Sequence, residues 1–409
     1  MKLLFVCHRL PFPPIRGGKI RPFNMIRHLH DSGHEVTVAS LARSAEELEA
    51  GQGLRGHCHE LLAERVTEPA AMVRMVLRLP TPVPSSMGNF YSPALARRVR
   101  EALATTRFDA IVVHCSSVAQ YVADAGATPR MLDFGDMDSQ KWLAYSQFRG
   151  LPLAPGFWIE GTKLERAEKA LARQFDLCTC TTRAELDTLD GFGTGAATGW
   201  FPNGVDSAFF KPSTQQWDPD LVTFLGRMDY YPNQEAMQRF CREVMPRVQA
   251  KRPATRLEIV GADPSPAIRR LGELPGVTVT GSVPDVRPYL ERACLTVAPL
   301  SIARGTQNKI LEAMGSAIPV VCSDIAAGGV DAVPGEHLLA ATAAKDTADA
   351  VLSVLDDPAL RERLAQAGRE RVLSHHNWAH SMQRFDALLE QCVVGAAGRQ
   401  VPSGSESAA

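Results

Sequence analysis

The sequence lacks the features that would commit it to a membrane or to nucleic acid. Its 409 residues contain no stretch of 18 apolar residues free of charge, so no segment is long enough to span a bilayer. The 44 basic and 45 acidic residues leave a net charge of −1, which offers no electrostatic footprint for nucleic acid. The apolar run Leu3–Cys7 is too short for the core of a secretory signal. We therefore expect a cytoplasmic protein.

The cysteines do not form a recognisable framework. They are nine, an odd number, and they are scattered, which argues against disulfides and for a reducing compartment. Cys178 and Cys180 alternate in a strand-like stretch and are expected to be small buried hydrophobic residues. The triplet His57-Cys58-His59 has no second ligand pair at the spacing of a zinc site. We predict no bound metal and no cofactor.

Two common phosphate-binding fingerprints are also missing. The pattern G-x-G-x-x-G is absent, which counts against a nicotinamide-binding domain. Gly17-Gly18-Lys19 is not a Walker A motif, because the upstream Gly and the downstream Ser or Thr are missing. The two glycines are predicted to end a loop after the first strand. There they allow positive φ and a close approach to a ligand, or they simply turn the chain.

Short apolar runs alternate with helical patterns along the chain, which predicts parallel sheets. The length suits two domains rather than one core. Predicted strands lie at 2–7, 35–39, 110–114, 130–133 and 177–181, and, after a turn-rich crossing at 201–220, at 221–225, 256–260, 277–280, 295–298 and 319–322. We expect an N-terminal Rossmann-like domain at 1–200, a C-terminal one at 201–376, a helix at 377–394 and a disordered tail at 395–409.

The segment from Pro69 to Leu79 is apolar, with Arg74 and Arg78 one helical turn apart. Such a helix can lie on an anionic membrane surface. It can equally be an ordinary amphipathic helix on the protein surface. Peripheral contact with the inner face of the plasma membrane therefore stays an open alternative.

The run Arg304-Gly-Thr-Gln-Asn-Lys-Ile-Leu-Glu-Ala-Met-Gly315 is the most informative segment. A polar loop feeds a short helix there, and an apolar strand follows. The start of a helix leaves N–H groups unpaired and carries partial positive charge, so this loop is a ready anion site. Lys309 falls in the first turn, where the helix dipole disfavours a cation, which makes it a functional candidate. Glu312, one turn on, adds a carboxylate for sugar hydroxyls.

This run resembles the nucleotide-sugar site of the retaining glycosyltransferases of family 4, which have the GT-B fold. Those enzymes usually carry Glu-x7-Glu, which is changed here to Arg304-x7-Glu312. The variant Arg-Gly-x-Gln-Asn-Lys-x-Leu-Glu-Ala-Met resembles the sugar transferases found beside exosortase and exopolysaccharide gene clusters. The resemblance implies an α/β fold in which two Rossmann-like domains face each other across a cleft.

The same resemblance implies roles for residues along the chain. Gly17 and Gly18 are expected to meet the donor diphosphate, and Val283 to lie where relatives contact the nucleobase through backbone groups. The full set of implied donor-binding residues is Gly17, Gly18, Arg227, Val283, Arg304, Asn308, Lys309, Ile310, Leu311 and Glu312.

Three residues at predicted strand ends are the catalytic candidates. His114 closes the strand 110–114, and ligands of open α/β sheets bind beyond the carboxyl ends of strands. Family 4 enzymes often have a His there, near the transferred sugar. Asp133 and Asp136 follow the next strand, where acids either cap the following helix or hold acceptor hydroxyls. A structural histidine and plain helix caps remain the alternatives.

Arg227 closes the first predicted strand of the second domain, and in the family this Arg grips the diphosphate with its fork of donors. A Lys commonly follows six residues on, but Asn233 stands there. Lys309 is a candidate for supplying the missing charge, which would link the two departures.

From these residues we expect an enzyme that transfers a sugar from a nucleotide diphosphate sugar to a glycan or lipid-linked acceptor, with retention, in exopolysaccharide biosynthesis. Departure of the diphosphate develops negative charge, which Arg227, Lys309 and helix N–H groups would offset. A nucleotide-sugar epimerase and a non-catalytic sugar-binding protein are the alternatives, the latter because Arg304 replaces a Glu. The donor base, the sugar and the linkage stay open.

Overall fold

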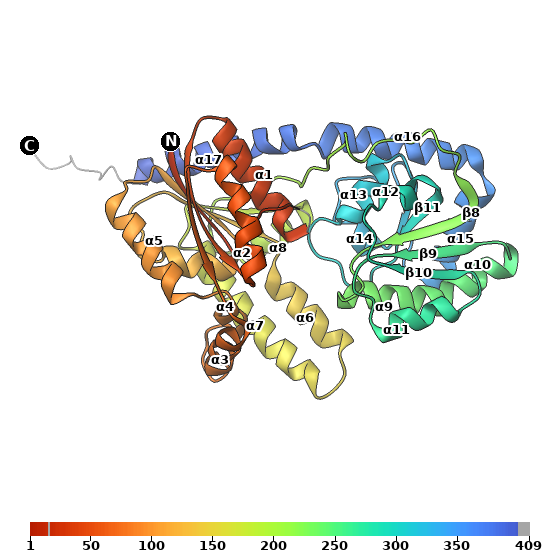
Figure 1. Cartoon of the computed structure of the whole chain (residues 1–409), viewed down its shortest axis with the longest axis horizontal. Helices are drawn as coiled ribbons and strands as arrows, with labels where there is room; N and C mark the ends of the chain where they lie inside the picture. The colour runs from red at the N-terminus through yellow and green to blue at the C-terminus, as the bar shows by residue number, and fades with distance from the viewer. Residues whose placement is uncertain (15–16, 400–409) are drawn as a thin grey trace, which may run out of the picture. The chain divides into compact units, whose positions relative to one another are not determined.

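The computed structural model describes residues 1–14 and 17–399 and divides into two compact units (Figure 1). The first unit comprises Met1–Thr181, Glu185–Phe201 and the chain from Met382 on, and the second comprises Thr182–Ala184 and Pro202–Ser381. Each unit holds a parallel sheet and its own hydrophobic core. The two Rossmann-like domains expected from the alternation of strands and helices are therefore present.

The described part of the first unit has a seven-stranded sheet in the order β3-β2-β1-β4-β5-β6-β7. Its strands are β1 (Lys2–Cys7), β2 (Glu35–Ala42), β3 (Glu60–Arg65), β4 (Ala110–His114), β5 (Arg130–Gly135), β6 (Leu177–Cys180) and β7 (Thr198–Trp200). Its helices are α1 (Gly17–Asp31), α2 (Ala45–Ala50), α3 (Glu68–Arg78), α4 (Ser85–Asn89), α5 (Pro93–Thr105), α6 (Asp138–Phe148), α7 (Leu153–Ala172) and α8 (Arg183–Asp190). All pairings are parallel, so helical crossovers must connect neighbouring strands.

The described part of the second unit has a six-stranded parallel sheet in the order β10-β9-β8-β11-β12-β13. Its strands are β8 (Asp218–Leu225), β9 (Arg256–Val260), β10 (Val277–Gly281), β11 (Ala293–Ala298), β12 (Val320–Cys322) and β13 (Leu339–Ala340). Its helices are α9 (Tyr231–Arg239), α10 (Met245–Lys251), α11 (Pro266–Arg269), α12 (Arg287–Glu291), α13 (Asn308–Gly315), α14 (Asp324–Ala327), α15 (Ala344–Asp356) and α16 (Pro358–His375).

The central strands are buried on both faces, which is why they appear in the sequence as continuous apolar runs. Every residue of β4 is buried, and β8 is buried from Leu221 onward. Because the strands of each sheet are parallel, their carboxyl ends lie at the same edge of that sheet. The residues that follow β1, β4 and β5 therefore gather at the carboxyl edge of the first sheet.

The last helix, α17 (Trp378–Arg399), groups with the first unit from Met382 on. It continues through Gly395 to Arg399, so the disordered tail expected from Gly395 is wrong for its first five residues. A single Gly costs a helix only about 1 kcal/mol, too little to end it. Residues 400–409 lie outside the described part. Among the residues described, none of the helices is both long and apolar enough to cross a membrane.

Candidate functional site

His114 stands at the carboxyl edge of the first sheet, directly beside Asp133. It is the last residue of β4, and the parallel register pairs it with Asp133 of β5. Nδ1 of His114 lies 2.7 Å from Oδ2 of Asp133. The two residues are 5% and 0% exposed. The strand-end placement predicted for His114 is confirmed, whereas β5 continues two residues beyond the predicted end at Asp133, to Gly135.

Asp133 is held by donors from three other elements. The Nε and Nη2 atoms of Arg21 donate to its two oxygens at 2.8 and 2.9 Å. The Thr179 hydroxyl donates to Oδ1 at 2.9 Å. We call His114, Asp133, Arg21 and Thr179 the His114 cluster. Because Asp133 has no exposed surface and its oxygens already accept these bonds, it cannot itself contact a substrate. Its predicted catalytic role is thus corrected to a positioning role.

The charge state of Asp133 fixes the tautomer of His114. Burial alone would raise the pKa of Asp133, but the Arg21 guanidinium and the hydrogen bond from His114 together lower it well below its usual range. An ionised carboxylate only accepts hydrogen bonds, so Nδ1 of His114 carries the proton. Nε2 is then the nitrogen that can face a ligand.

The residues around His114 are unusually arranged. Cys115, which follows it, has φ 80°, a strained value for a residue with a side chain. The His8 ring lies 5.6 Å from the His114 ring, and Nδ1 of His8 has no hydrogen-bond partner among the described residues. The ligand atoms of His8, His114 and Cys115 lie within 4.8 Å of one another, so these three are the residues that could hold a metal. Burial raises the pKa of the Cys115 thiol well above its usual value, which opposes formation of the thiolate that metals bind.

Asp136 differs from Asp133 in being partly exposed. It lies between β5 and α6, and its Oδ1 accepts a hydrogen bond from Thr181 at 3.2 Å. Asp138, in the first turn of α6, has a raised pKa, chiefly because it is buried. Of the predicted acids, Asp136 is therefore the one placed to reach a hydroxyl.

The second unit gathers a different group at the carboxyl end of β8. Nζ of Lys309, from the first turn of α13, donates to Oδ1 of Asn233 at 2.6 Å and lies 4.3 Å above the Phe224 ring. Nδ2 of Asn233 in turn donates to the carbonyl oxygen of Arg227 at 2.8 Å. We call Gly226, Asn233, Lys309 and Glu312 the Lys309 cluster. The structure thus places Lys309 in direct contact with Asn233, which stands where the family commonly has a Lys.

Glycine makes room for this cluster. A Cβ on Gly226 would lie 2.7 Å from Nδ2 of Asn233 and 3.1 Å from Nζ of Lys309, and its φ of 156° is one that side chains rarely adopt. A Cβ on Gly261 would lie 1.7 Å from the carbonyl oxygen of Gly226. Both positions therefore require glycine.

Burial shifts both ionisable groups of the cluster toward neutrality. Lys309 and Glu312 keep some accessible surface, but the packing around their charged ends is dense. Burial lowers the pKa of Lys309 to about 7 and raises that of Glu312 to about 7, while the charge of each partially offsets the shift of the other. An anion arriving here would favour the protonated lysine.

Two of the predicted donor contacts are not supported by the structure. Ile310 and Leu311 are 0% and 1% exposed and belong to the hydrophobic core. Their N–H groups already donate to the carbonyl oxygen of Gln307. Because the side chains of Ile310 and Leu311 pack in the core, only Asn308 and Lys309 among the first four residues of α13 keep accessible surface.

Arg227 lies beyond β8, as predicted, but two carboxylates hold it. Its Nη2 contacts Asp229 at 2.6 Å and Asp263 at 2.9 Å, and hydrogen bonding to Asp229 is the main cause of its raised pKa. A diphosphate would have to compete with these acids. Lys309 instead donates to the neutral amide of Asn233, and Glu312 acts on it only through its charge.

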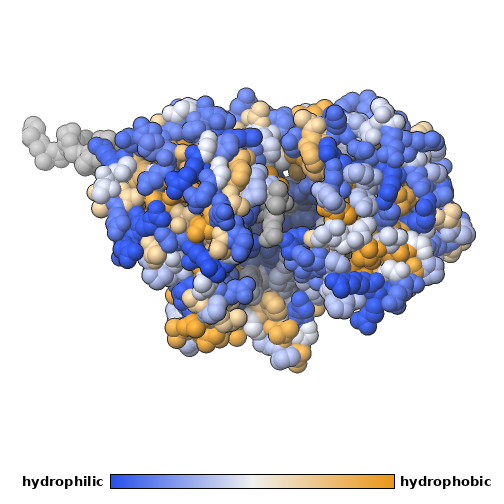
Figure 2. Space-filling model, in the orientation of Figure 1, coloured by the Kyte–Doolittle hydropathy of each residue, from blue (hydrophilic) through white to orange (hydrophobic). Residues whose placement is uncertain are grey.

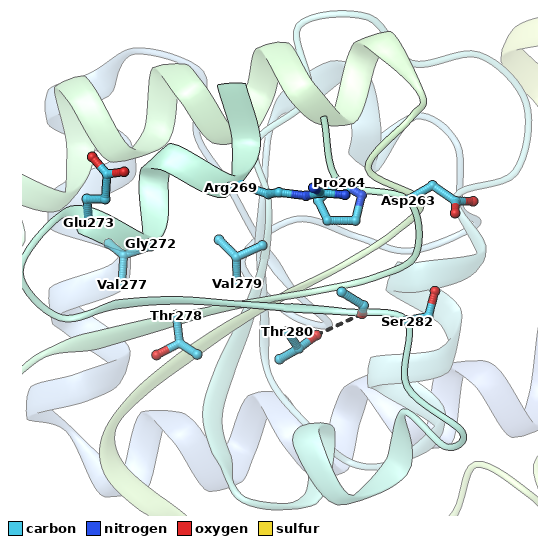
Figure 3. Close-up of a pocket in the computed structure, with 11 residues that line it drawn as sticks. Asp263, Pro264, Arg269, Gly272, Glu273, Val277, Thr278, Val279, Thr280 and Ser282 are labelled. Carbon is cyan, nitrogen blue, oxygen red and sulfur yellow. Dashed lines mark hydrogen bonds between the residues drawn. The ribbon is translucent and has the colours of Figure 1, made fainter. Parts of the chain in front are cut away.

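Asp263 also begins a groove along the edge strand β10 (Figure 3). Figure 3 shows Asp263 and Ser282 at one end of this groove and Glu273 at the other. Val283 follows Ser282, and its side chain packs against the core of the unit. Val283 also keeps some accessible surface, and its contact with the nucleobase stays a prediction.

The two glycines after β1 are not in a loop. Gly17 and Gly18 form the exposed first turn of α1. Among the described residues beyond its chain neighbours, none has an atom within 4 Å of a Cβ built on Gly18. The expected use of positive φ is not seen at Gly18, which is helical.

Arg304 precedes the turn into α13 and is partly exposed, and its carbonyl oxygen accepts a hydrogen bond from Gln307 at 3.1 Å. Gly305 beside it has φ 60°.

Sequence reasoning missed Arg21 although a signal was present. Lys19 and Arg21 lie in the first two turns of α1, where the helix dipole disfavours cations, and this was the reasoning that singled out Lys309. Lys19 pairs with Glu47 at 2.6 Å, as Arg21 pairs with Asp133. The unfavourable position of a cation near a helix start therefore singles out Lys19 and Arg21 as well as Lys309.

Comparison with known families agrees with this architecture. Residues 16–204 match the model described as glycosyl transferase 4-like domain, and residues 219–357 match glycosyl transferases group 1. Together the two matches cover most of both units. The chain therefore belongs to the glycosyltransferases that combine these two domains, and its fold is GT-B.

Individual relatives are distant. Phosphatidyl-myo-inositol mannosyltransferase from Mycobacterium leprae is 27% identical over 83% of this chain and 88% of its own. Glycogen synthase from Mycobacterium tuberculosis is 28% identical over 54% of this chain, and the chain spans only about half of that relative, 56% of its length. Among solved structures, sucrose-phosphate synthase from Thermosynechococcus elongatus has a TM-score of 0.71 at 17% identity, covering 96% of this chain and 100% of its own. Anabaena HepE in complex with UDP has a TM-score of 0.67 at 16% identity, covering 95% and 100%.

The buried Arg21–Asp133 pair generates a stability prediction. Arg21→Met leaves the Asp133 carboxylate buried beside fewer donors, and breaking such a pair costs about 3–5 kcal/mol of unfolding free energy. Lys2→Met, which removes an exposed pair with Glu35, is the matched control and should cost about 0–1 kcal/mol. Urea unfolding of the two variants measures the difference. Equal losses would contradict the structural role of Arg21.

Proposed function

We propose that this protein is an enzyme that transfers a sugar from a nucleotide diphosphate sugar to a glycan or lipid-linked acceptor, with retention of anomeric configuration. We assign it to exopolysaccharide biosynthesis, at the inner face of the plasma membrane, on the resemblance of the run from Arg304. The observation that supports this activity is the Lys309 cluster. Its cation, Lys309, lies at the start of α13, next to Gly226 at the end of β8, where there is no side chain.

The Lys309 cluster suits a diphosphate for three reasons. The start of α13, at Asn308 and Lys309, carries the partial positive charge of a helix N-terminus. Lys309 adds a charge that is hydrogen-bonded to a neutral amide rather than to a carboxylate, so a phosphate oxygen can replace this partner more easily. Glu312, one turn on, is assigned to hydroxyls of the ribose or the sugar. The solved HepE structures, on the same fold, contain UDP and UDP-glucose.

In the reaction, the bond between the anomeric carbon and the diphosphate oxygen breaks, and a bond from the same carbon to an acceptor hydroxyl oxygen forms. The hydroxyl proton passes to the departing diphosphate. Lys309, the start of α13 and Arg227 offset the charge that develops on the leaving group. We assign Nε2 of His114 to the transferred sugar, Asp133 to holding that ring, and Asp136 to the acceptor.

A panel of nucleotide sugars tests the activity directly. Incubated with the full chain, one of them should release its nucleoside diphosphate, and His114→Ala should slow that release while leaving UDP binding unchanged. Recovery of an epimerised donor would identify an epimerase instead. Binding of donors with no release in the presence of glycan and lipid-linked acceptors would identify a non-catalytic binder.

The low pKa of Lys309 predicts how UDP binding depends on pH. Below pH 7 the lysine is protonated and can pair with the diphosphate, and above pH 7 it loses its proton, so affinity should fall by up to about tenfold per pH unit. Lys309→Arg stays protonated and also holds Glu312 ionised, so its affinity should change little. Calorimetric titrations between pH 7 and 9 measure both slopes. Parallel slopes for the two proteins would show that another group is titrating.

The contact between Lys309 and Asn233 predicts that the charge can be moved. Lys309→Ala should weaken UDP binding by about 1.5–3 kcal/mol, the worth of a hydrogen bond to a charged group. Adding Asn233→Lys to that variant should restore much of the loss, because position 233 reaches the same point from α9. The control is Gln234→Lys on the Lys309→Ala background, which adds the same charge at the neighbouring position. Rescue by both lysines, or by neither, would contradict a shared charge site.

A further inference from the structure

One surface of the first unit exposes far more apolar area than an ordinary surface does. On α3, Met72, Val73, Val76 and Leu77 are 53–67% exposed. In the turn between α6 and α7 and the start of α7, Leu151 is 85% exposed and Trp158 is 57% exposed. Figure 2 shows hydrophobic residues gathered along the lower edge of the molecule, where Figure 1 places α3 and the α6–α7 turn. We call α3 and this turn together the apolar surface.

The orientation of α3 is the reverse of an ordinary surface helix, which buries its apolar stripe and exposes its charges. Of its residues, all of which the structure describes, Ala71 alone is buried. Its arginines turn back to the protein instead. Nε of Arg74 donates to the carbonyl oxygen of Gly88 at 3.2 Å, and Nη2 of Arg78 donates to Gln120 at 3.2 Å. These bonds hold the apolar face outward.

The two parts of the apolar surface are joined by polar contacts beneath it. Nζ of Lys163, on α7, donates to the carbonyl oxygen of Leu79 at 2.8 Å. The buried Glu160 carboxylate accepts from the backbone N–H groups of Ser85 and Ser86 at 3.0 and 2.8 Å. Since α7 thereby anchors the chain just after α3, the apolar side chains are presented on a fixed framework.

The charges of the apolar surface indicate what covers it. The surface holds the exposed acid Glu68 at the start of α3, whereas segments 69–83 and 147–159 contain no Asp or Glu and carry Arg74, Arg78 and Arg149, so basic residues are in excess. Large apolar side chains with a tryptophan and an excess of basic residues suit the headgroup region of an anionic bilayer, with the half-exposed Arg74 and Arg78 at the border of the apolar face. We propose that the protein docks on an anionic lipid bilayer through this surface.

Docking there brings the bilayer to the edge of the sheet that holds His114. α3 follows β3 and α6 follows β5, so both leave the carboxyl edge. Gln120, the partner of Arg78, lies in the turn Ser116–Val122 that begins two residues after His114. A lipid-linked acceptor held in the bilayer would therefore meet the His114 cluster. This choice of acceptor rests on the proposed function, whereas the docking itself does not.

Vesicle binding by the full chain tests the proposal. The protein should sediment with phosphatidylglycerol vesicles and much less with phosphatidylcholine vesicles. Trp158 should report docking by a blue shift of emission that Trp158→Phe removes. The double variant Val73→Asp/Leu77→Asp, which alters one exposed face of α3, should lower the partition coefficient at least about tenfold. Val394→Asp, at an apolar residue of α17 that is 64% exposed, is the matched control and should bind as the wild type does.

Three outcomes would overturn the docking proposal. One is wild-type protein that fails to sediment with phosphatidylglycerol vesicles, and another is equal binding by the α3 variant and the Val394→Asp control. The third is a wild-type dimer in light scattering that the α3 variant converts to a monomer, because a second copy would then cover the surface. Release of nucleoside diphosphate, measured without vesicles, reports on the proposed function separately. Vesicle binding combined with no release, even when glycan and lipid-linked acceptors are supplied, would leave docking standing and remove the transferase.

Discussion

The proposed diphosphate site depends on how little room surrounds the ammonium group of Lys309. The carboxyl end of β8 has no side chain at Gly226, and Gly261 lets the neighbouring strand approach that glycine closely. The space left admits the Lys309–Asn233 hydrogen bond over the Phe224 ring. Burial by the same packing lowers the pKa of Lys309. The packing that positions the ammonium group therefore also makes it easier for the group to lose its proton.

Lys19, Arg21 and Lys309 lie near the starts of their helices against the preference of the helix dipole, and they differ in the partners that hold them. Lys19 and Arg21 are paired with carboxylates and buried, so each is neutralised within the fold. Lys309 is paired with an amide and partly accessible, so its charge remains available to a ligand. Arg21 still serves the site indirectly, because the carboxylate it holds orients His114.

The sequence alone predicted the strands and strand ends whose signal is a local pattern of residues. Buried parallel strands appear as continuous apolar runs, so β1, β4 and β9 were predicted with their observed bounds, and the strand-end position of His114 followed. β3 was missed because Glu60 and Arg65 break its apolar run, and β13 because it has only two residues. Ile310 and Leu311 were assigned to the donor by the motif although their apolar character already indicated the core. The Lys309–Asn233 and Arg21–Asp133 contacts join residues 76 and 112 positions apart, which no local pattern reveals.

The central claim is that the diphosphate of the donor binds at the start of α13 beside Lys309. A crystal structure of the full chain with UDP tests it most directly. The account predicts a β-phosphate oxygen within about 3 Å of Nζ of Lys309, the distance of a charge-assisted hydrogen bond. A diphosphate bound elsewhere, with Lys309 still donating only to Asn233, would contradict the assignment.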